Sequence, residues 1–208
     1  MTLLRLGENG KLLLGGQELK PAGRNIAVLV DTSGSMSGDK LSQVKTGTVD
    51  FALSVIPKGY AVAVIVFGDR GAVVCEPTAD SGTLARKIAG LSVGIVGGST
   101  YLGKGLAVAA KVPSLSHVLV VTDGQANDSA NALTVAVGLR SVGVEILTLG
   151  THDADTSFLA RLASRPDMSV SVNDSGIRSA MGQAGQLLLT NGINAIVQST
   201  PIPLRGDN

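Results

Sequence analysis

The chain is poor in sulfur, aromatic rings and net charge. Its 208 residues include one cysteine, Cys75, no tryptophan, two tyrosines and three phenylalanines. With a single cysteine no internal disulfide can form, which fits a reducing compartment. The formal net charge of +1 argues against a surface dedicated to nucleic acid. Hydrophobic residues make up 44% of the chain, so a sizeable core must be built from Val, Leu, Ile and Ala.

Signals for secretion and for membrane insertion are also missing. The N-terminal apolar stretch is broken by Arg5, Glu8 and Lys11, which does not fit a secretory signal. No run of about 18 apolar residues occurs, so no membrane span is predicted. We therefore expect a soluble, cytoplasmic protein.

Short aliphatic runs alternate with segments of helical periodicity along most of the chain. Continuous runs of Val, Ile and Leu are typical of strands that are buried on both faces. The expected strands are Ile26–Val30, Ala61–Phe67, Ala72–Cys75, His117–Thr122, Glu145–Leu149 and Ser169–Val172. The expected helices are Lys40–Ile56, Ser81–Ala89, Tyr101–Lys111, Ser129–Val142, Ser157–Ala163 and Ile177–Leu189.

This alternation predicts an α/β fold. Right-handed crossovers give a mostly parallel central sheet with helices on both faces, which is a doubly wound three-layer sandwich of Rossmann-like type. Ala72–Cys75 follows its neighbour after a short turn, so we expect it to return as one antiparallel edge strand.

The pattern divides the chain into three regions. The α/β domain is expected over residues 25–190. Residues 1–24 form an N-terminal extension, in which Asn9–Gly10 is compatible with a hairpin although the flanking alternation is poor. Residues 191–208 are expected to form an extended C-terminal tail.

Side chains that carry oxygen gather in three loops. The segment DTSGS, with Asp31, Ser33 and Ser35, follows the first strand of the domain, and TDGQAND, with Asp123, follows the strand at His117. The segment GGSTYLGKGL places Thr100 just before a helix. In a doubly wound sheet, ligands bind at the carboxyl edge of the strands, near the point where the winding reverses.

These oxygen atoms suit a small, hard cation. Asp31, Ser33 and Ser35 can converge because alternate residues of an extended loop point the same way. Thr100 and Asp123 complete a set of three hydroxyls and two carboxylates with no imidazole or thiolate. Such a set favours Mg²⁺ or Mn²⁺ over Ca²⁺, whereas Zn²⁺ prefers nitrogen or sulfur ligands.

The combination of DTSGS, Thr100 and VTDG resembles the metal-ion-dependent adhesion site (MIDAS) of von Willebrand factor A (vWA) domains. The resemblance covers roughly Asn25 to Leu189, and the motif positions occur in chain order, each in its expected loop. It implies a vWA fold with a divalent cation.

The resemblance also implies a role for each residue. Ser33, Ser35 and Thr100 ligate the metal through their hydroxyls, and Asp31 and Asp123 act largely through bound water. Neutral direct ligands leave the ion attractive to an incoming carboxylate. An Asp or Glu of a partner protein would fill the open position. In similar domains this event is coupled to a shift of the last helix.

Simpler roles compete with this interpretation at single positions. Asp31 and Ser33 could cap a helix, and Asp123 could serve in a turn; only the coincidence of the three loops favours a metal site. Asp153 and Asp155 are expected to lead into the next helix rather than to form a second cation site. His117 and Cys75 are expected to be structural residues, and the RGD sequence at residues 205–207 is attributed to chance.

Three functions remain open at this stage. The leading one is a non-catalytic protein-binding module that acts as an adaptor or assembly factor, possible partners including the ring-shaped ATPases that similar stand-alone bacterial domains serve. The second is a metal-dependent phosphatase or other hydrolase with Asp31 as nucleophile. It is weakened by Ser33, which stands where a second carboxylate is needed, and by the absence of a basic residue in the metal loops. The third is a structural vWA domain with an empty site.

Overall fold

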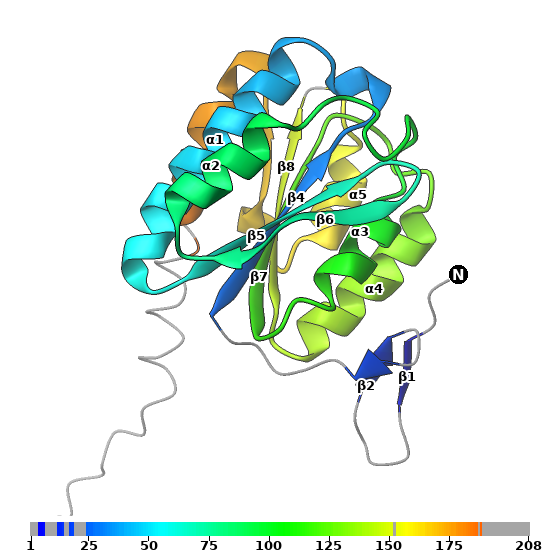
Figure 1. Cartoon of the computed structure of the whole chain (residues 1–208). Coiled ribbons are helices and arrows are strands. Elements are labelled where there is room, and N and C mark those ends of the chain that lie inside the picture. Colours follow the sequence, from blue (N-terminus) through cyan, green and yellow to red (C-terminus); the bar gives the residue numbers. More distant parts are fainter. Residues whose placement is uncertain are drawn as a thin grey trace, which may run out of the picture.

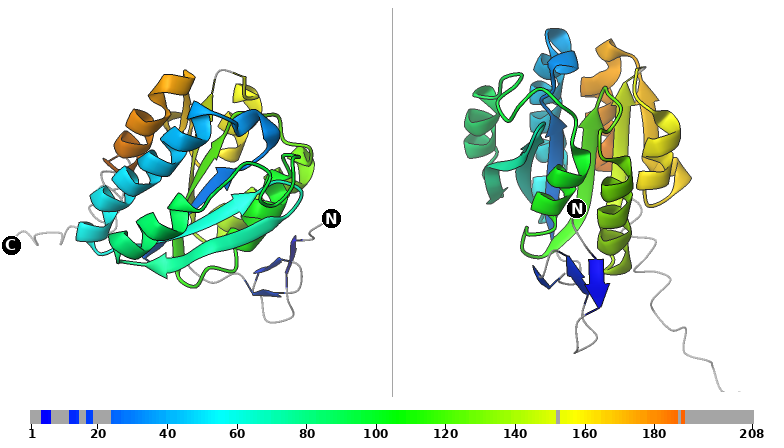
Figure 2. Two further views of the ribbon diagram at one scale, coloured as in Figure 1. Left: turned by 45° about the horizontal axis from the view of Figure 1, so that its top comes forward. Right: turned by 90° about the vertical axis from the view of Figure 1, so that its right-hand side faces the viewer.

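A six-stranded sheet forms the centre of the domain, with helices on both of its faces (Figure 1; Figure 2). The computed structural model describes residues 4–6, 12–14, 17–18, 24–151, 153–186 and 188. The predicted three-layer α/β sandwich is confirmed. Among the described residues, none of the helices is long and apolar enough to cross a membrane.

The first strand of the domain lies in the middle of the sheet. The strands in spatial order are β6 (Gly71–Thr78), β5 (Ala61–Phe67), β4 (Asn25–Asp31), β7 (Leu115–Thr122), β8 (Glu145–Thr151) and β9 (Ser169–Val172). All neighbours pair parallel except β5 and β6, which pair antiparallel. The chain builds outward from β4 to one side and then to the other. The winding therefore reverses between β4 and β7, where a doubly wound sheet binds its ligands.

The predicted antiparallel edge strand is confirmed, but it is longer than expected. It continues past Cys75 through Glu76 and Pro77 to Thr78, and its register against β5 shifts in two places. Proline is tolerated there because an edge strand has one side without ladder hydrogen bonds.

Alternate side chains of the strands enter two separate cores. Ile26, Val28 and Val30 of β4 pack on one face of the sheet, and Ala27 and Leu29 pack on the other. The helices are α1 (Asp39–Val55), α2 (Ser81–Ala89), α3 (Leu102–Ala109), α4 (Ser129–Ser141), α5 (Thr156–Leu162) and a last helix at residues 177–186. Helices α1, α2 and the last helix cover the first face, and α3, α4 and α5 cover the second (Figure 1).

Short single-turn helices and a small second sheet complete the described structure. The 3₁₀ turns are η1 (Gly34–Met36), η2 (Ile56–Lys58), η3 (Pro166–Met168) and η4 (Asp174–Gly176). Strands β1 (Leu4–Leu6), β2 (Leu12–Leu14) and β3 (Gln17–Glu18) pair antiparallel in that order. The turn predicted around Asn9–Gly10 and the tail predicted over residues 191–208 lie outside the described residues.

His117 is buried at the amino-terminal edge of the sheet, opposite the predicted metal site. Its Nδ1 lies 2.8 Å from Ser116 Oγ and its Nε2 lies 3.7 Å from Glu145 Oε2. The Tyr60 ring meets the imidazole edge-on, with 5.7 Å between centroids. Burial lowers the pKa of His117, and the nearby Glu145 carboxylate only partly offsets this effect.

This histidine should make the domain less stable in mild acid. The unfolded chain takes up the proton near the ordinary histidine pKa of about 6.5, but the folded chain resists it. The stabilisation is therefore complete above that pH and is lost as the pH falls through the lower folded pKa. Melting temperatures between pH 8 and 5.5 should fall more steeply for the wild-type protein than for His117→Gln. Equal slopes in the two proteins would contradict this assignment.

Candidate metal centre

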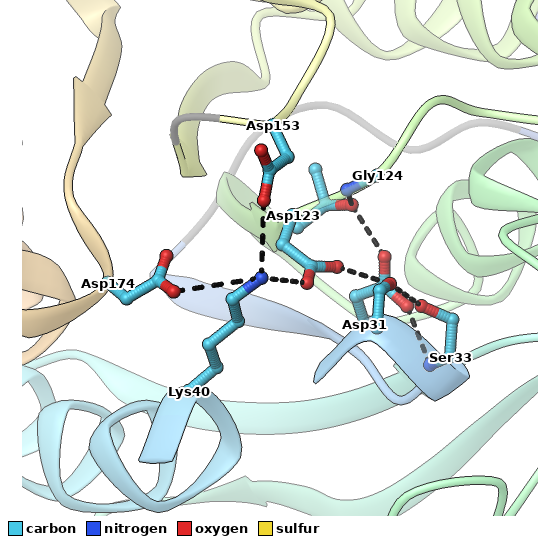
Figure 3. Close-up of polar contacts among 9 residues, drawn as sticks. Asp31, Ser33, Lys40, Asp123, Gly124, Asp153 and Asp174 are labelled. Carbon is cyan, nitrogen blue, oxygen red and sulfur yellow. Dashed lines mark hydrogen bonds and ion pairs between the residues drawn. The ribbon is translucent and has the colours of Figure 1, made fainter. Parts of the chain in front are cut away.

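The carboxylate of Asp31 joins the two strands that flank the reversal point of the sheet. Asp31 ends β4 and is fully buried. Its Oδ1 accepts a hydrogen bond from the backbone N–H of Ser33 at 2.8 Å, and its Oδ2 accepts one from the hydroxyl of Thr122, the last residue of β7 (Figure 3). Burial raises the pKa of Asp31, although these hydrogen bonds oppose the rise. An anion in this position is stabilised by a nearby cation.

The two serines of DTSGS lie beside this carboxylate. The turn η1 bends the loop, so that Ser33 Oγ comes within 3.0 Å of Ser35 Oγ. The Ser35 hydroxyl donates to Asp123 Oδ1 at 2.7 Å, from the loop that follows β7. Because the Ser35 proton points to Asp123, Ser35 Oγ accepts the hydrogen bond from Ser33 and keeps one further lone pair. Ser33 is buried and Ser35 is exposed, so the pair runs from the interior to the solvent.

Thr100 is held in place by a reciprocal pair of hydrogen bonds with the loop after β7. Its backbone N–H donates to Asn127 Oδ1 at 2.7 Å, and the Asn127 N–H donates to the Thr100 carbonyl at 2.9 Å. On the other side, Asp69 Oδ1 accepts from the Ser99 N–H at 3.0 Å. Both supporting residues escaped the sequence analysis, because nothing in the local sequence pairs them with a loop about 30 residues away.

The structure therefore brings the side-chain oxygens of all the predicted site residues into one place. This oxygen cluster consists of Asp31, Ser33, Ser35, Thr100 and Asp123. Its members come from three loops at the carboxyl edge of the sheet.

Gly124 keeps the middle of the oxygen cluster open. A Cβ at this position would lie 3.4 Å from Thr100 Oγ1 and 3.9 Å from Ser35 Oγ, so the glycine leaves a gap beside both hydroxyls that a larger side chain would fill. The described residues contain no group of three or more His, Cys, Asp or Glu side chains suited to a metal. A small gap lined by hydroxyls, with two carboxylates behind them, fits a hard divalent cation.

The three metal loops contain no basic residue, as predicted, but a basic side chain reaches the site from α1. Lys40, in the first turn of α1, places its Nζ 2.7 Å from Asp123 Oδ2, 3.6 Å from Asp153 Oδ2 and 3.8 Å from Asp174 Oδ2 (Figure 3). The hydrogen bond to Asp123 is the main reason why the pKa of Lys40 is raised. Sequence reading assigned Lys40 only to the helix, because the side chain reaches three loops that are distant in the sequence.

The acidic residues of the β8–α5 loop have separate uses. Asp155 Oδ1 accepts from the Phe158 N–H at 2.9 Å and so caps α5, in line with the predicted lead into that helix. Asp153 faces Lys40 (Figure 3). The two carboxylates therefore do not share a ligand.

Comparison with known proteins assigns the family of the fold. The family model of the von Willebrand factor type A domain matches residues 25–183. The chain belongs to this family. The resemblance drawn from DTSGS, Thr100 and VTDG is confirmed, and vWA domains are typically adhesion or protein-binding modules.

Regions similar to this chain occur in larger proteins. The collagen alpha-4(VI) chain of Mus musculus is 30% identical over 159 residues, which is 68% of this chain and 6% of the collagen chain. Proximal thread matrix protein 1 of the mussel byssus, in a structure with a zinc-occupied MIDAS motif, matches with a TM-score of 0.70. It is 22% identical, and the match covers 82% of this chain and 47% of the mussel chain.

A bacterial structure has the same fold at lower identity. The vWF domain of the type V pili tip protein Mfa5 from Porphyromonas gingivalis has a TM-score of 0.72 and 13% identity, covering 90% of this chain and 98% of that one. At such identities the likeness shows the vWA fold alone. The chain thus spans about half of the mussel protein and a small part of the collagen chain.

Removing the buried charge of Asp31 should stabilise the metal-free domain and abolish its response to metal. In Asp31→Asn the amide can still accept from the Ser33 N–H and donate to the Thr122 hydroxyl, so only the charge is lost. We expect a higher melting temperature than wild type in EDTA and little or no increase on addition of Mg²⁺. Scanning calorimetry of both proteins with and without Mg²⁺ measures the two effects.

The neighbouring Asp39 provides a matched control for this substitution. It is an exposed carboxylate in the first turn of α1, so Asp39→Asn should change stability by no more than about 0.5 kcal/mol and keep the Mg²⁺ response. A lower melting temperature of Asp31→Asn in EDTA would show that the Asp31 charge does not destabilise the fold.

Proposed function

We propose that this vWA domain is a divalent-cation-dependent module that binds an acidic side chain of a partner protein. The observation that carries the proposal is the convergence of the oxygen cluster around the gap at Gly124. Ser33, Ser35 and Thr100 would ligate Mg²⁺ or Mn²⁺ through their hydroxyls. Asp31 and Asp123 would bind the ion's water molecules. Such an ion supplies an open coordination position that a carboxylate of the partner fills.

The surroundings of Asp31 support binding rather than catalysis. A nucleophilic carboxylate must reach the substrate, but Asp31 is fully buried and both of its oxygens accept hydrogen bonds within the domain. A phosphatase would also need a basic side chain to bind the phosphate group of its substrate. Lys40 is not available for this role, since three carboxylates surround its ammonium group. Members of the vWA family are generally non-catalytic binding modules.

We further propose that the domain serves as an adaptor or assembly factor. An adaptor or assembly factor needs a binding site for a partner, and the oxygen cluster would provide one. A ring-shaped ATPase complex is one partner class to test. With a single cysteine the chain cannot form an internal disulfide. This supports a cytoplasmic location, because disulfides are rare in proteins of reducing compartments.

Removing the two serine hydroxyls should abolish both cation binding and partner capture. For the wild-type domain, Mg²⁺ at 100 times its Kd should add about 2.7 kcal/mol to the free energy of unfolding. Ser33→Ala combined with Ser35→Ala should show no such gain. The same variant should lose the proteins that the wild type retains from a lysate in Mg²⁺ but releases in EDTA. Thermal denaturation and a pull-down measure these effects.

Two exposed serines of the same region give the control. Ser37→Ala combined with Ser42→Ala removes hydroxyls outside the oxygen cluster and should behave like wild type. Identical melting curves with and without Mg²⁺ for the wild-type protein would instead favour a structural domain with an empty site. Turnover of a phosphate ester that depends on Mg²⁺ and on Asp31 would favour the hydrolase.

A methyl group at Gly124 should weaken cation binding without unfolding the domain. The added Cβ of Gly124→Ala makes only ordinary van der Waals contacts, so the fold should tolerate it. The methyl group enters the gap beside the Thr100 and Ser35 hydroxyls, and we expect a roughly tenfold weaker Kd for Mg²⁺ or Mn²⁺, as for other changes next to metal ligands. Isothermal titration calorimetry measures the constant.

Gly98→Ala is the matched control, because a Cβ at Gly98 meets nothing within 4 Å. It should bind the cation as the wild type does. Equal affinity in Gly124→Ala and wild type would show that the cation does not bind in this gap.

A further inference from the structure

Lys40 connects α1 to three loops at the rim of the oxygen cluster. Its ammonium group lies among Asp123 after β7, Asp153 after β8, and Asp174 at the start of η4, just before the last helix (Figure 3). The side chain of Lys40 is only 14% exposed, and its shortest contact, at 2.7 Å, is with the buried Asp123. The two longer contacts are with half-exposed or exposed carboxylates.

The position of Lys40 in the helix is locally unfavourable. It occupies the first turn of α1, where the helix dipole disfavours a positive charge. The N-cap residue is Gly38, which provides no side-chain hydrogen bond to the helix. A lysine that breaks a local rule and is compensated by distant carboxylates is more typical of a functional site than of a structural one.

Lys40 and Ser35 together occupy both oxygens of Asp123. The Ser35 hydroxyl donates to Oδ1 at 2.7 Å, and the Lys40 ammonium donates to Oδ2 at 2.7 Å. These two donors fix the orientation of the Asp123 carboxylate, and turning it to bring an oxygen into direct contact with a cation would weaken at least one of the two hydrogen bonds. Because a charge-assisted hydrogen bond of this length is strong, the lysine restrains Asp123 in its present position.

We propose that Lys40 is a positioning residue that keeps the Asp123 carboxylate out of direct contact with the bound cation. The inference rests on the proposed function, in which Ser33, Ser35 and Thr100 supply neutral ligands. An ion without a carboxylate in direct contact retains more positive charge for an acidic ligand. Lys40 thus lowers the affinity for the cation and raises the affinity of the bound cation for the ligand's carboxylate.

Loss of the lysine should therefore change two affinities in opposite directions. In Lys40→Met, Asp123 is free to turn and coordinate the cation directly. The domain should bind Mn²⁺ roughly tenfold more tightly, because the released Asp123 carboxylate becomes a direct ligand of the ion. The bound Mn²⁺ should carry fewer exchangeable water molecules and should bind acetate more weakly. Loss of a merely structural contact would weaken Mn²⁺ binding and leave the hydration of the bound ion unchanged.

The experiment uses Mn²⁺ as the cation and acetate as the probe for the acidic ligand. Electron paramagnetic resonance of free Mn²⁺ gives the Kd, and water-proton relaxation gives the hydration of the bound ion and its loss on acetate titration. Lys45→Met is the matched control, since Lys45 lies on the same helix and its ammonium donates to the Ala89 carbonyl. Lys40→Arg retains the positive charge and should bind Mn²⁺ and acetate much as the wild type does.

A double-mutant cycle separates positioning from simple charge repulsion. In an Asp123→Asn background, a further Lys40→Met change should leave the Mn²⁺ affinity nearly unchanged, because the carboxylate that Lys40 positions is already gone. An equally large gain of affinity in that background would overturn the proposal, since it would arise from charge alone. If Lys40→Met does not fold, Lys40→Gln is measured in its place with the same expectations.

The outcomes distinguish this inference from the function on which it rests. Failure of the wild-type domain to bind Mn²⁺ would overturn the proposed function and the role of Lys40 with it. Binding by the wild type, with unchanged or weaker binding and unchanged hydration in Lys40→Met, would overturn the role of Lys40 alone. Tighter Mn²⁺ binding, fewer water molecules and weaker acetate binding together would support both.

Discussion

The buried carboxylate of Asp31 is the constraint on which the carboxyl edge of the sheet depends. It lies at the end of the central strand β4 and accepts hydrogen bonds from its own loop and from Thr122 of the neighbouring strand β7. The charge therefore fixes the starting points of two loops at once. It also costs stability, because burial disfavours the ionised form and raises its pKa. A divalent cation in the gap beside it would offset that cost and couple metal binding to the order of both loops.

The rest of the site follows from this arrangement of loops. The loop after β4 supplies two serines on a bent segment, the loop before α3 supplies Thr100, and the loop after β7 supplies Asp123 and Gly124. Asp69 and Asn127 accept hydrogen bonds from the backbone of the loop before α3 and so fix its position. The Thr100 hydroxyl is therefore not needed to anchor this loop. Neutral hydroxyls then line the gap, while both carboxylates are occupied by hydrogen bonds from the protein. This is the arrangement expected of a site that holds a cation without neutralising it.

Much of the fold and of the candidate site was predictable, because short stretches of the sequence indicate the strands and the polar residues next to them. The apolar run of β4 ends in Asp31, and the apolar run within β7 is followed by Thr122 and Asp123, so the sequence alone marks both the buried strands and their polar ends. Thr100 was identifiable for a similar reason, as a hydroxyl after paired glycines and before a helix. What remained hidden depends on contacts over long sequence separations. The Asp31–Thr122 pair spans 91 positions and the Lys40–Asp123 pair spans 83, and no periodicity reports such distances.

Location of the cation tests the central claim most directly. Crystals grown with Mn²⁺ and measured at the manganese absorption edge should show one strong anomalous peak in the gap beside Gly124. Its nearest protein atoms should be the hydroxyl oxygens of Ser33, Ser35 and Thr100. The account would be contradicted by the absence of a peak there, or by a peak whose protein ligands lie elsewhere on the domain.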